Sequence, residues 1–471
     1  MVLVAGFHAD AALAQQGGQA EASGTISSAA GYYEFLMARR LETAGNTDAA
    51  LAALQRAAAA DPSSAQVKAE IAALHLRRSP PQRDAAEKAA KEALALDDKN
   101  VEANRTLGYL YANAVDTGSA TMTAQMAANL RNAIMHLERA QAGVVGTDVN
   151  LLYMLGRLYT ANSETQKAIQ ILTRVVVQNP TNPQALRSLA QAFAAGGDLK
   201  GAISTLSEVV EFVPNVAGDL GQYQEQAGLH RDAAASYTIA LAVSPNSARL
   251  KLNRVRALYA AREYSEAARF AGEARKQHPE DPRFPQLQAR ALFDGGDRSA
   301  AIAVAESTAR AFPKDTQMQF VLVDLYQDAG REGDAERVLR QILASEPANP
   351  NALNTLGYML AVRGEQLDEA ISLVRRALEK DPENGAFLDS LGWAYFRRGN
   401  LNEAQKYLAA AAERMPDNSE VQDHLGDLRA RQGQLQDAIQ AWTRALAGDG
   451  DGIDRAVIER KVQDARKKLA K

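Results

Sequence analysis

Arginine and aromatic residues recur at helical spacing through this sequence, and they are the side chains best suited to chemistry. They are Tyr153, Arg157, Arg187, Arg249, Arg256, Tyr259, Arg283, Arg290 and Phe293 in the middle of the chain, and Trp393 and Phe396 near its end. Asn253, a polar residue between Arg249 and Arg256, belongs to the same set. Arginine pairs with carboxylates through two parallel hydrogen bonds, and beside aromatic rings it suits an extended peptide or a partner helix. The pattern therefore predicts a protein-binding groove. Solvated helix faces whose charges cluster by chance are the alternative.

Acidic residues occupy corresponding positions further along the chain. They are Asp389, Glu420, Asp423 and Asp427. We expect them on the same surface, which is then basic and aromatic in its middle and acidic near its end.

The sequence contains no pattern typical of catalysis or metal binding. Its 6 histidines are scattered, and none forms an HExxH or similar ligand spacing. The GGD stretches at 196–198 and 295–297 fit turns between helices, because no strand precedes them as a phosphate-binding loop requires. The absence of cysteine excludes disulfides, thiolate metal sites and a cysteine nucleophile. We expect no enzyme activity, no metal and no cofactor.

Composition favours an elongated helical array. The 471 residues exceed the size at which one compact core keeps growing, and aromatic residues make up only 6%. A formal net charge of -4 gives no general attraction for nucleic acid or an anionic membrane. After the N-terminus, no stretch approaches the about 20 apolar residues that span a bilayer.

The elements that carry these residues repeat along the chain. Residues 388–418 align with residues 421–446 at an offset of 34, so that Leu391-Gly392 falls over Leu425-Gly426. Repeats begin near Gly31, Ala65, Val101, Val149, Pro183, Ala217, Ala248, Pro282, Thr316, Pro350, Gly385 and Ser419. We expect a disordered tail or signal-peptide remnant over 1–30, a repeat array over 31–450 and a capping helix over 451–471.

This pattern resembles the tetratricopeptide repeat (TPR) family. The residues that carry the resemblance are the Leu-Gly pairs at 107–108, 155–156, 356–357, 391–392 and 425–426, the small residues Ala50, Ala168, Ala202, Ala267, Ala335, Ala370, Ala404 and Ala438, and a proline near the end of most repeats. The resemblance implies an all-α, right-handed superhelix (α-solenoid) of about twelve helix-turn-helix repeats with a C-terminal capping helix. In that fold the first helix of each repeat lines the concave groove.

Polar residues predict where most first helices begin. Ser64, Asn100, Asp148, Asn182, Ser247, Asp281, Asp315, Asn349, Asn384 and Asn418 precede the later repeats, and all can accept backbone N–H groups. Pro183, Pro282 and Pro350 are expected at the first helical position. Val216 has no polar side chain that could accept these N–H groups. The repeat that follows it is only 31 residues long, since 248 - 217 is 31. We expect a short or irregular first helix there, loosened by Gly218 and Gly221.

Two segments depart from the repeat. The repeat from Val101 is 48 residues long, since 149 - 101 is 48, and its insertion over 114–130 predicts an extended loop, a lengthened second helix or both. Exposed Met122 and Met126 suit a contact surface, although a solvated insertion without a partner is equally consistent. The last segment predicts a capping helix with a basic outer face that favours solubility, and its apolar side carries Ile453, Val457, Val462, Ala465 and Leu469.

The N-terminus carries a pattern typical of export. A short apolar run leads to Ala12-Leu13-Ala14 before Gln15, which has the small-x-small form of a signal-peptidase site. A disordered tail rich in alanine, glycine and glutamine is the alternative.

The C-terminal repeats, residues 352–446, resemble bacterial envelope TPR proteins such as the lipoprotein scaffold of the periplasmic carboxy-terminal processing protease. The lipid-anchoring cysteine of those lipoproteins is not present in this sequence. The carboxylate clamp of co-chaperone TPR proteins is not expected, because only Arg249 with Asn253 approaches its pattern.

The leading hypothesis is a non-enzymatic scaffold, periplasmic or associated with the outer membrane, that binds proteins or peptides in its groove and presents substrates to a protease or export complex. The alternative is a regulatory TPR subunit of a cytoplasmic enzyme, such as a glycosyltransferase or a signalling protein.

Overall fold

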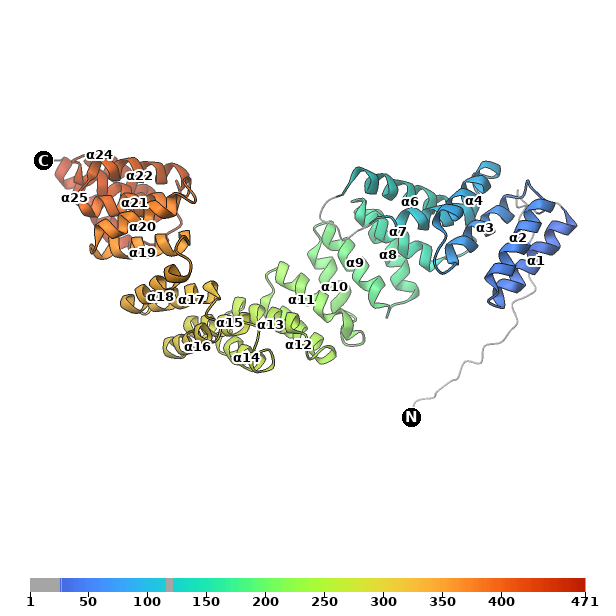
Figure 1. Ribbon diagram of the computed structural model, residues 1–471, viewed down its shortest axis with the longest axis horizontal. Helices are drawn as coiled ribbons and strands as arrows, with labels where there is room; N and C mark the ends of the chain where they lie inside the picture. The colour runs from blue at the N-terminus through green and yellow to red at the C-terminus, as the bar shows by residue number, and fades with distance from the viewer. Residues whose placement is uncertain (1–25, 27, 116–121, 471) are drawn as a thin grey trace. The chain divides into compact units, whose positions relative to one another are not determined.

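A computed structural model describes residues 26, 28–115 and 122–470, and all regular secondary structure within them is helical. The chain divides into two compact units, Met1–Asn246 and Ser247–Lys471, and within each unit consecutive helices pair as hairpins (Figure 1). The expected export signal lies outside the described residues. None of the described helices is both long enough and apolar enough to pass through a membrane.

The first unit consists of helical hairpins joined by short turns. Its elements are α1 (Ala29–Thr43), α2 (Thr47–Ala60), α3 (Ala65–Arg77), α4 (Arg83–Leu96), α5 (Val101–Ala112), α6 (Ala124–Gly143), α7 (Val149–Ala161), α8 (Thr165–Gln178), α9 (Pro183–Ala195), α10 (Leu199–Ser207), the 3-10 turn η1 (Pro214–Val216), α11 (Ala217–Gln226) and α12 (His230–Val243).

The second unit repeats the arrangement and ends with a single helix. Its elements are α13 (Ala248–Ala260), α14 (Tyr264–Gln277), α15 (Arg283–Asp294), α16 (Arg298–Ala311), α17 (Thr316–Asp328), α18 (Glu332–Ser345), α19 (Pro350–Arg363), α20 (Leu367–Leu378), α21 (Gly385–Arg398), α22 (Leu401–Arg414), α23 (Ser419–Arg431), α24 (Leu435–Ala447) and α25 (Arg455–Leu469). The described residues thus confirm the predicted all-α solenoid of helix-turn-helix repeats.

Small residues occupy the points where paired helices cross. The predicted alanines Ala168, Ala202, Ala267, Ala335, Ala370, Ala404 and Ala438 are all completely buried. Glycine on the facing helix allows the close approach. A Cβ atom on Gly156 would lie 2.4 Å from Cγ of Leu172, and one on Gly392 would lie 2.9 Å from the backbone nitrogen of Leu408. A side chain there would push the helices apart.

Polar side chains begin most first helices, as the sequence predicts. A backbone N–H of the first turn donates to the side chain of Ser64, Asn100, Asp148, Asn182, Ser247, Asp315, Asn349, Asn384 and Asn418. The prediction is wrong at α15, where Pro282 precedes the helix instead of beginning it. Asp281 still accepts the backbone N–H of Arg283, the first residue of α15, at 3.1 Å, and Nε and Nη2 of Arg283 also contact its carboxylate, at 2.8 and 2.7 Å.

The short repeat differs in part from its prediction. Helix α11 has only 10 residues, as expected, but η1 precedes it, and the second helix of the preceding repeat, α10, has only 9 residues. Gly221 also has a packing role in α11. A Cβ atom there would lie 2.7 Å from Cε1 of Tyr237, so this glycine permits the ring to pack against the helix.

The insertion lies between α5 and α6, and residues 116–121 within it are outside the described range. Helix α6 has 20 residues, which is longer than its counterparts and accommodates part of the insertion. Met122 is exposed and Met126 is half-buried.

Helix α25 covers the last hairpin. Ile458, Val462 and Ala465 are buried in a cluster with Trp442 of α24. The prediction is wrong for Leu469, which is exposed because it lies one turn beyond Ala465, the last buried residue of the helix.

A column of rings joins the first helices α19, α21 and α23. Ring centroids are 6.2 Å apart for Tyr358 and His424, 3.9 Å for His424 and Trp393, and 4.9 Å for Trp393 and Phe396. Nδ1 of His424 lies 2.9 Å from Oδ2 of Asp389, and both residues are buried. Burial opposes a charge on His424, but the neighbouring carboxylates, led by Asp389, raise its pKa above the ordinary value.

Replacing a crossing glycine tests the packing. We expect Gly392→Val to lower the free energy of unfolding by about 2 kcal/mol, because the new side chain meets the backbone of α22. Urea unfolding followed by circular dichroism measures the change. Gly333→Ala in α18 is the control: its Cβ has no neighbour within 4 Å, so a gain of about 0.5 kcal/mol is expected. Equal effects at both positions would contradict the packing argument.

The pair of His424 and Asp389 predicts a pH dependence of stability. Because the folded-state pKa of His424 is raised, its contribution is fully present below the unfolded value of about 6.5 and is lost as pH rises through the folded value. Asp389→Asn should reduce this dependence, leaving only the weaker influence of Glu420 and Asp423, and cost about 3 kcal/mol near pH 6. Urea midpoints across pH measure both effects. The control Asp368→Asn removes an exposed acid paired with Arg398 and should change little. A parent protein equally stable across this range would contradict the assignment.

Candidate protein-binding surface

The predicted surface residues of the first unit come from α7 and α9. The hydroxyl of Ser188 lies 3.4 Å from that of Tyr153, and the guanidinium of Arg157 lies 5.9 Å from the centre of the Tyr153 ring. Arg187 instead serves the fold. Its Nε is 2.6 Å from Oδ2 of Asp219, and its Nη2 donates to the carbonyl of Asn215. Arg157 is the exposed cation of this group.

In the second unit, a recess of about 230 Å³ gathers three of the predicted arginines. Arg256 of α13 and Arg283 and Arg290 of α15 line it, together with Gln286, Leu287, Val321, Asp324 and Leu325. Arg256 and Arg290 are one repeat apart, since 290 - 256 is 34. Stacking of the hairpins therefore brings them to one place, beside apolar side chains of α15 and α17. We call this the first-helix recess.

Two of these arginines already have partners. Nε of Arg290 lies 3.1 Å from Oδ2 of Asp294 and 3.4 Å from the hydroxyl of Tyr259, which itself donates to Asp294. Burial and this hydrogen bond to Asp294 raise the pKa of Tyr259 above its ordinary value. Arg283 forms the fork with Asp281 described above, and that pairing lowers the pKa of Asp281. The positive charges of Arg283 and Arg290 are thus balanced by aspartates of the same unit.

Two arginines of α13, one of them in the recess, remain available to a partner. Arg249 and Arg256 are exposed, and neither forms a hydrogen bond or ion pair with any residue in the described ranges. Asn253, half-buried, lies between them in the helix. At the end of α15, Phe293 packs partly into the core with the guanidinium of Arg298 5.5 Å from its ring centre.

The C-terminal end is not the acidic surface that the sequence predicts. Asp389 is buried against His424, and Glu420 accepts a hydrogen bond from Tyr358. Nζ of Lys461 in α25 lies 2.8 Å from Asp423 and 2.7 Å from Asp427. The capping helix therefore neutralises these acids, and its basic face does more than improve solubility. Trp393 and Phe396 remain partly exposed in the ring column.

Sequence reasoning missed the partners of this acidic group. His424 has no metal-ligand spacing in the sequence, but Asp389 precedes it by 35 residues, which places the two at adjacent positions of consecutive repeats. Lys461 lies in the last segment, for which the sequence predicts only a capping helix. Within the described residues, no group of three or more histidine, aspartate and glutamate side chains could hold a metal ion.

Comparison with known proteins identifies the repeats. Two family models, both described as tetratricopeptide repeat, match the chain; one matches residues 225–291 and 361–430, and the other matches 153–217, 287–332 and 320–385. Together these segments cover more than half of the chain.

Individual relatives match this chain at low sequence identity or over only part of their length. A TPR repeat-containing protein of Pseudomonas aeruginosa is 30% identical over 158 residues, which are 33% of this chain and 27% of that relative. The match thus spans about a quarter of the relative's length. A crystallised tetratricopeptide repeat protein from Parabacteroides merdae has a TM-score of 0.37 at 14% identity, covering 68% of this chain and all of that one. The APC/C hetero-tetramer Cut9-Hcn1 has a TM-score of 0.41 at 12% identity, covering 93% of this chain and 97% of that one.

The described helices pair as hairpins in both units, and small buried residues lie at their crossings. The chain therefore belongs to the tetratricopeptide repeat family, whose fold is typically a non-catalytic scaffold for protein–protein interaction.

Proposed function

We propose that this chain is a non-enzymatic scaffold of the bacterial cell envelope and that its first-helix recess holds an acidic segment of a partner protein. The observation that carries the proposal is Arg256, which lines the recess, with Arg249 two turns before it on α13; both are exposed and have no hydrogen-bond or ion-pair partner among the described residues. An exposed guanidinium without an internal partner can offer both of its parallel N–H groups to one carboxylate.

The size of the recess supports a macromolecular partner. Its volume of about 230 Å³ is below the range of about 300–1,000 Å³ that encloses most small ligands. It suits one anchoring side chain from a larger partner. Leu287 and Val321 contribute apolar contact beside Arg256, which is the combination of apolar anchor and charged rim found at protein interfaces.

The envelope location rests on sequence features. Ala12-Leu13-Ala14 before Gln15 has the form of a signal-peptidase site, and residues 352–446 resemble envelope TPR scaffolds. A matching relative also comes from a bacterium, Pseudomonas aeruginosa. In this role the scaffold presents substrates to a periplasmic protease or an export complex.

Charge reversal tests the recess. The double variant Arg249→Glu with Arg256→Glu should reduce partner capture about tenfold or more, because each new carboxylate repels the acidic segment. Affinity capture from the native host with quantitative mass spectrometry measures this. The matched control Arg174→Glu with Arg444→Glu changes the same charge on exposed positions of second helices. Unaltered capture by the first variant, with circular dichroism showing both folded, would refute the recess.

The export proposal predicts a cleaved N-terminus. Protein purified from its native host should begin at Gln15, because a signal peptidase cuts after small residues in the Ala12-Leu13-Ala14 arrangement. N-terminal sequencing gives the answer directly. A chain that retains its initial residues, or loses only the first methionine, would favour the regulatory subunit of a cytoplasmic enzyme.

A further inference from the structure

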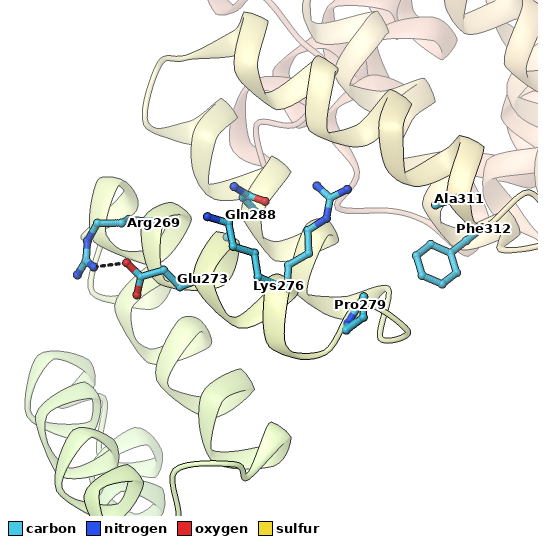
Figure 2. A pocket seen from close by; sticks show the side chains of 9 residues that line it. Arg269, Glu273, Lys276, Pro279, Gln288, Ala311 and Phe312 are labelled. Carbon is cyan, nitrogen blue, oxygen red and sulfur yellow. Dashed lines mark hydrogen bonds and ion pairs between the residues drawn. The ribbon is translucent and has the colours of Figure 1, made fainter.

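A larger recess lies on the second helices of the second unit, apart from the first-helix recess. It has a volume of about 760 Å³ and lies between α14 and the end of α16, with Gln288 of α15 also lining it. Figure 2 shows Lys276 extending beside Gln288, with the paired Arg269 and Glu273 at one end and Phe312 at the other. Nothing in the proposed function uses this surface.

A neighbouring recess extends this space along α14. It has a volume of about 330 Å³ and shares Arg269 and Gln288 with the larger one. The two together reach from Tyr264, the first residue of α14, to Pro279, just after its end. We call the combined space the outer trench. Its length suits an extended segment better than a single side chain.

One glycine shapes the wall of the larger recess formed by α14. Gly272 lines the larger recess, whereas the residues one repeat before and one and two repeats after it are Thr238, Glu306 and Arg340. A Cβ atom on Gly272 would lie 2.7 Å from Nε2 of Gln288. Helix α14 thus lacks a side chain where its counterparts carry one, and the amide end of Gln288 packs beside Gly272 and lines the recess.

The larger recess carries unneutralised positive charge. Nη1 of Arg269 is 2.7 Å from Oε1 of Glu273, so the charges of these two side chains cancel. Nη2 of Arg275 donates only to the hydroxyl of Ser307, at 3.2 Å, and Lys276 has no hydrogen bond or ion pair within the described part of the chain. Phe312, half-buried, lies at the same end. Two cations beside an aromatic ring favour an acidic partner that also carries an apolar side chain.

We propose that the outer trench binds an extended acidic segment of a partner protein, with carboxylates at Arg275 and Lys276 and an apolar side chain against Phe312. The 14 residues of α14 span roughly 21 Å, which about six extended residues cover. Nucleic acid fits less well. Glu273 and Asp297 also line the trench, and the chain carries a net charge of -4 rather than a basic stripe.

Peptide binding by the full-length protein tests the trench. The probe is a short fluorescein-labelled peptide of alternating glutamate and leucine, compared with the same peptide carrying glutamine for glutamate, and fluorescence anisotropy measures affinity. Gly272→Gln fills the space without changing charge, and Lys276→Glu reverses charge without filling it. Each should weaken binding of the glutamate peptide about tenfold. The glutamine peptide should bind the parent protein weakly.

Matched variants separate the trench from general effects. Gly333→Gln places the same residue in α18, where a Cβ has no neighbour within 4 Å, and Lys380→Glu reverses an exposed charge after α20. Both should bind the glutamate peptide as the parent does. Thermal unfolding followed by circular dichroism checks that all four variants are folded.

Three results would overturn the proposal. The first is no saturable binding of the glutamate peptide by the parent protein, or binding by both trench variants that is as tight as the parent's. The second is loss of binding only in Arg249→Glu with Arg256→Glu, which would place the peptide in the first-helix recess and leave the proposed function standing. The third is displacement of the peptide by a single-stranded oligothymidine whose own binding is lost in the trench variants, which would identify a nucleic-acid site.

Discussion

The structure depends on how closely two helices of a hairpin can approach. Gly156 against Leu172 and Gly392 against Leu408 leave no room for a further side chain, and the facing alanines are completely buried. A hairpin packed in this way still exposes an apolar face, so it is stable only when a neighbour covers it. At the end of the second unit the neighbour is α25, whose Ile458 and Val462 cover Trp442. The same constraint that forms the stack leaves polar faces on its first and second helices, where the proposed binding surfaces lie.

Charged side chains on these faces fall into two groups: those paired with another charged side chain of the fold, and those without such a partner among the described residues. Arg187 with Asp219 joins α9 to α11, and Lys461 holds α25 against Asp423 and Asp427. Such pairs link elements far apart in sequence and are part of the fold. Arg249, Arg256 and Lys276 make no comparable contact within the described ranges. Keeping unpaired cations on a protein with net charge -4 gives local positive potential that an acidic partner can use.

The fold class could be predicted from the sequence because its signals are local and recur. Caps such as Asn182 and Asn349, and alanines such as Ala404, act within one hairpin and are repeated many times. Prediction failed where a residue's role depends on a neighbour outside its own turn. Asp389 is expected on the exposed acidic surface, but it is buried against His424 of the next repeat.

The candidate site was predictable to a smaller extent for the same reason. Helical spacing placed Arg256, Arg283 and Arg290 on one face, and they do share a recess. Spacing could not show that Arg290 is bound to Asp294, since that depends on side-chain geometry. Nor could it show that Asp423 and Asp427 are neutralised, because Lys461 comes from a helix 38 residues beyond Asp423 in the sequence.

Helix α15 connects the two candidate surfaces of the second unit. Gln288 lines the outer trench and Arg290 lines the first-helix recess, and two residues along an α-helix turn through about 200°, so these side chains leave opposite sides of one helix. This follows from the position of α15, which packs against both α14 and α16. Gly272 lets the amide of Gln288 approach α14 on the outer side, and the glycines at helix crossings likewise let a facing side chain approach. The same residue type thus permits close packing both inside the hairpins and beside the outer trench.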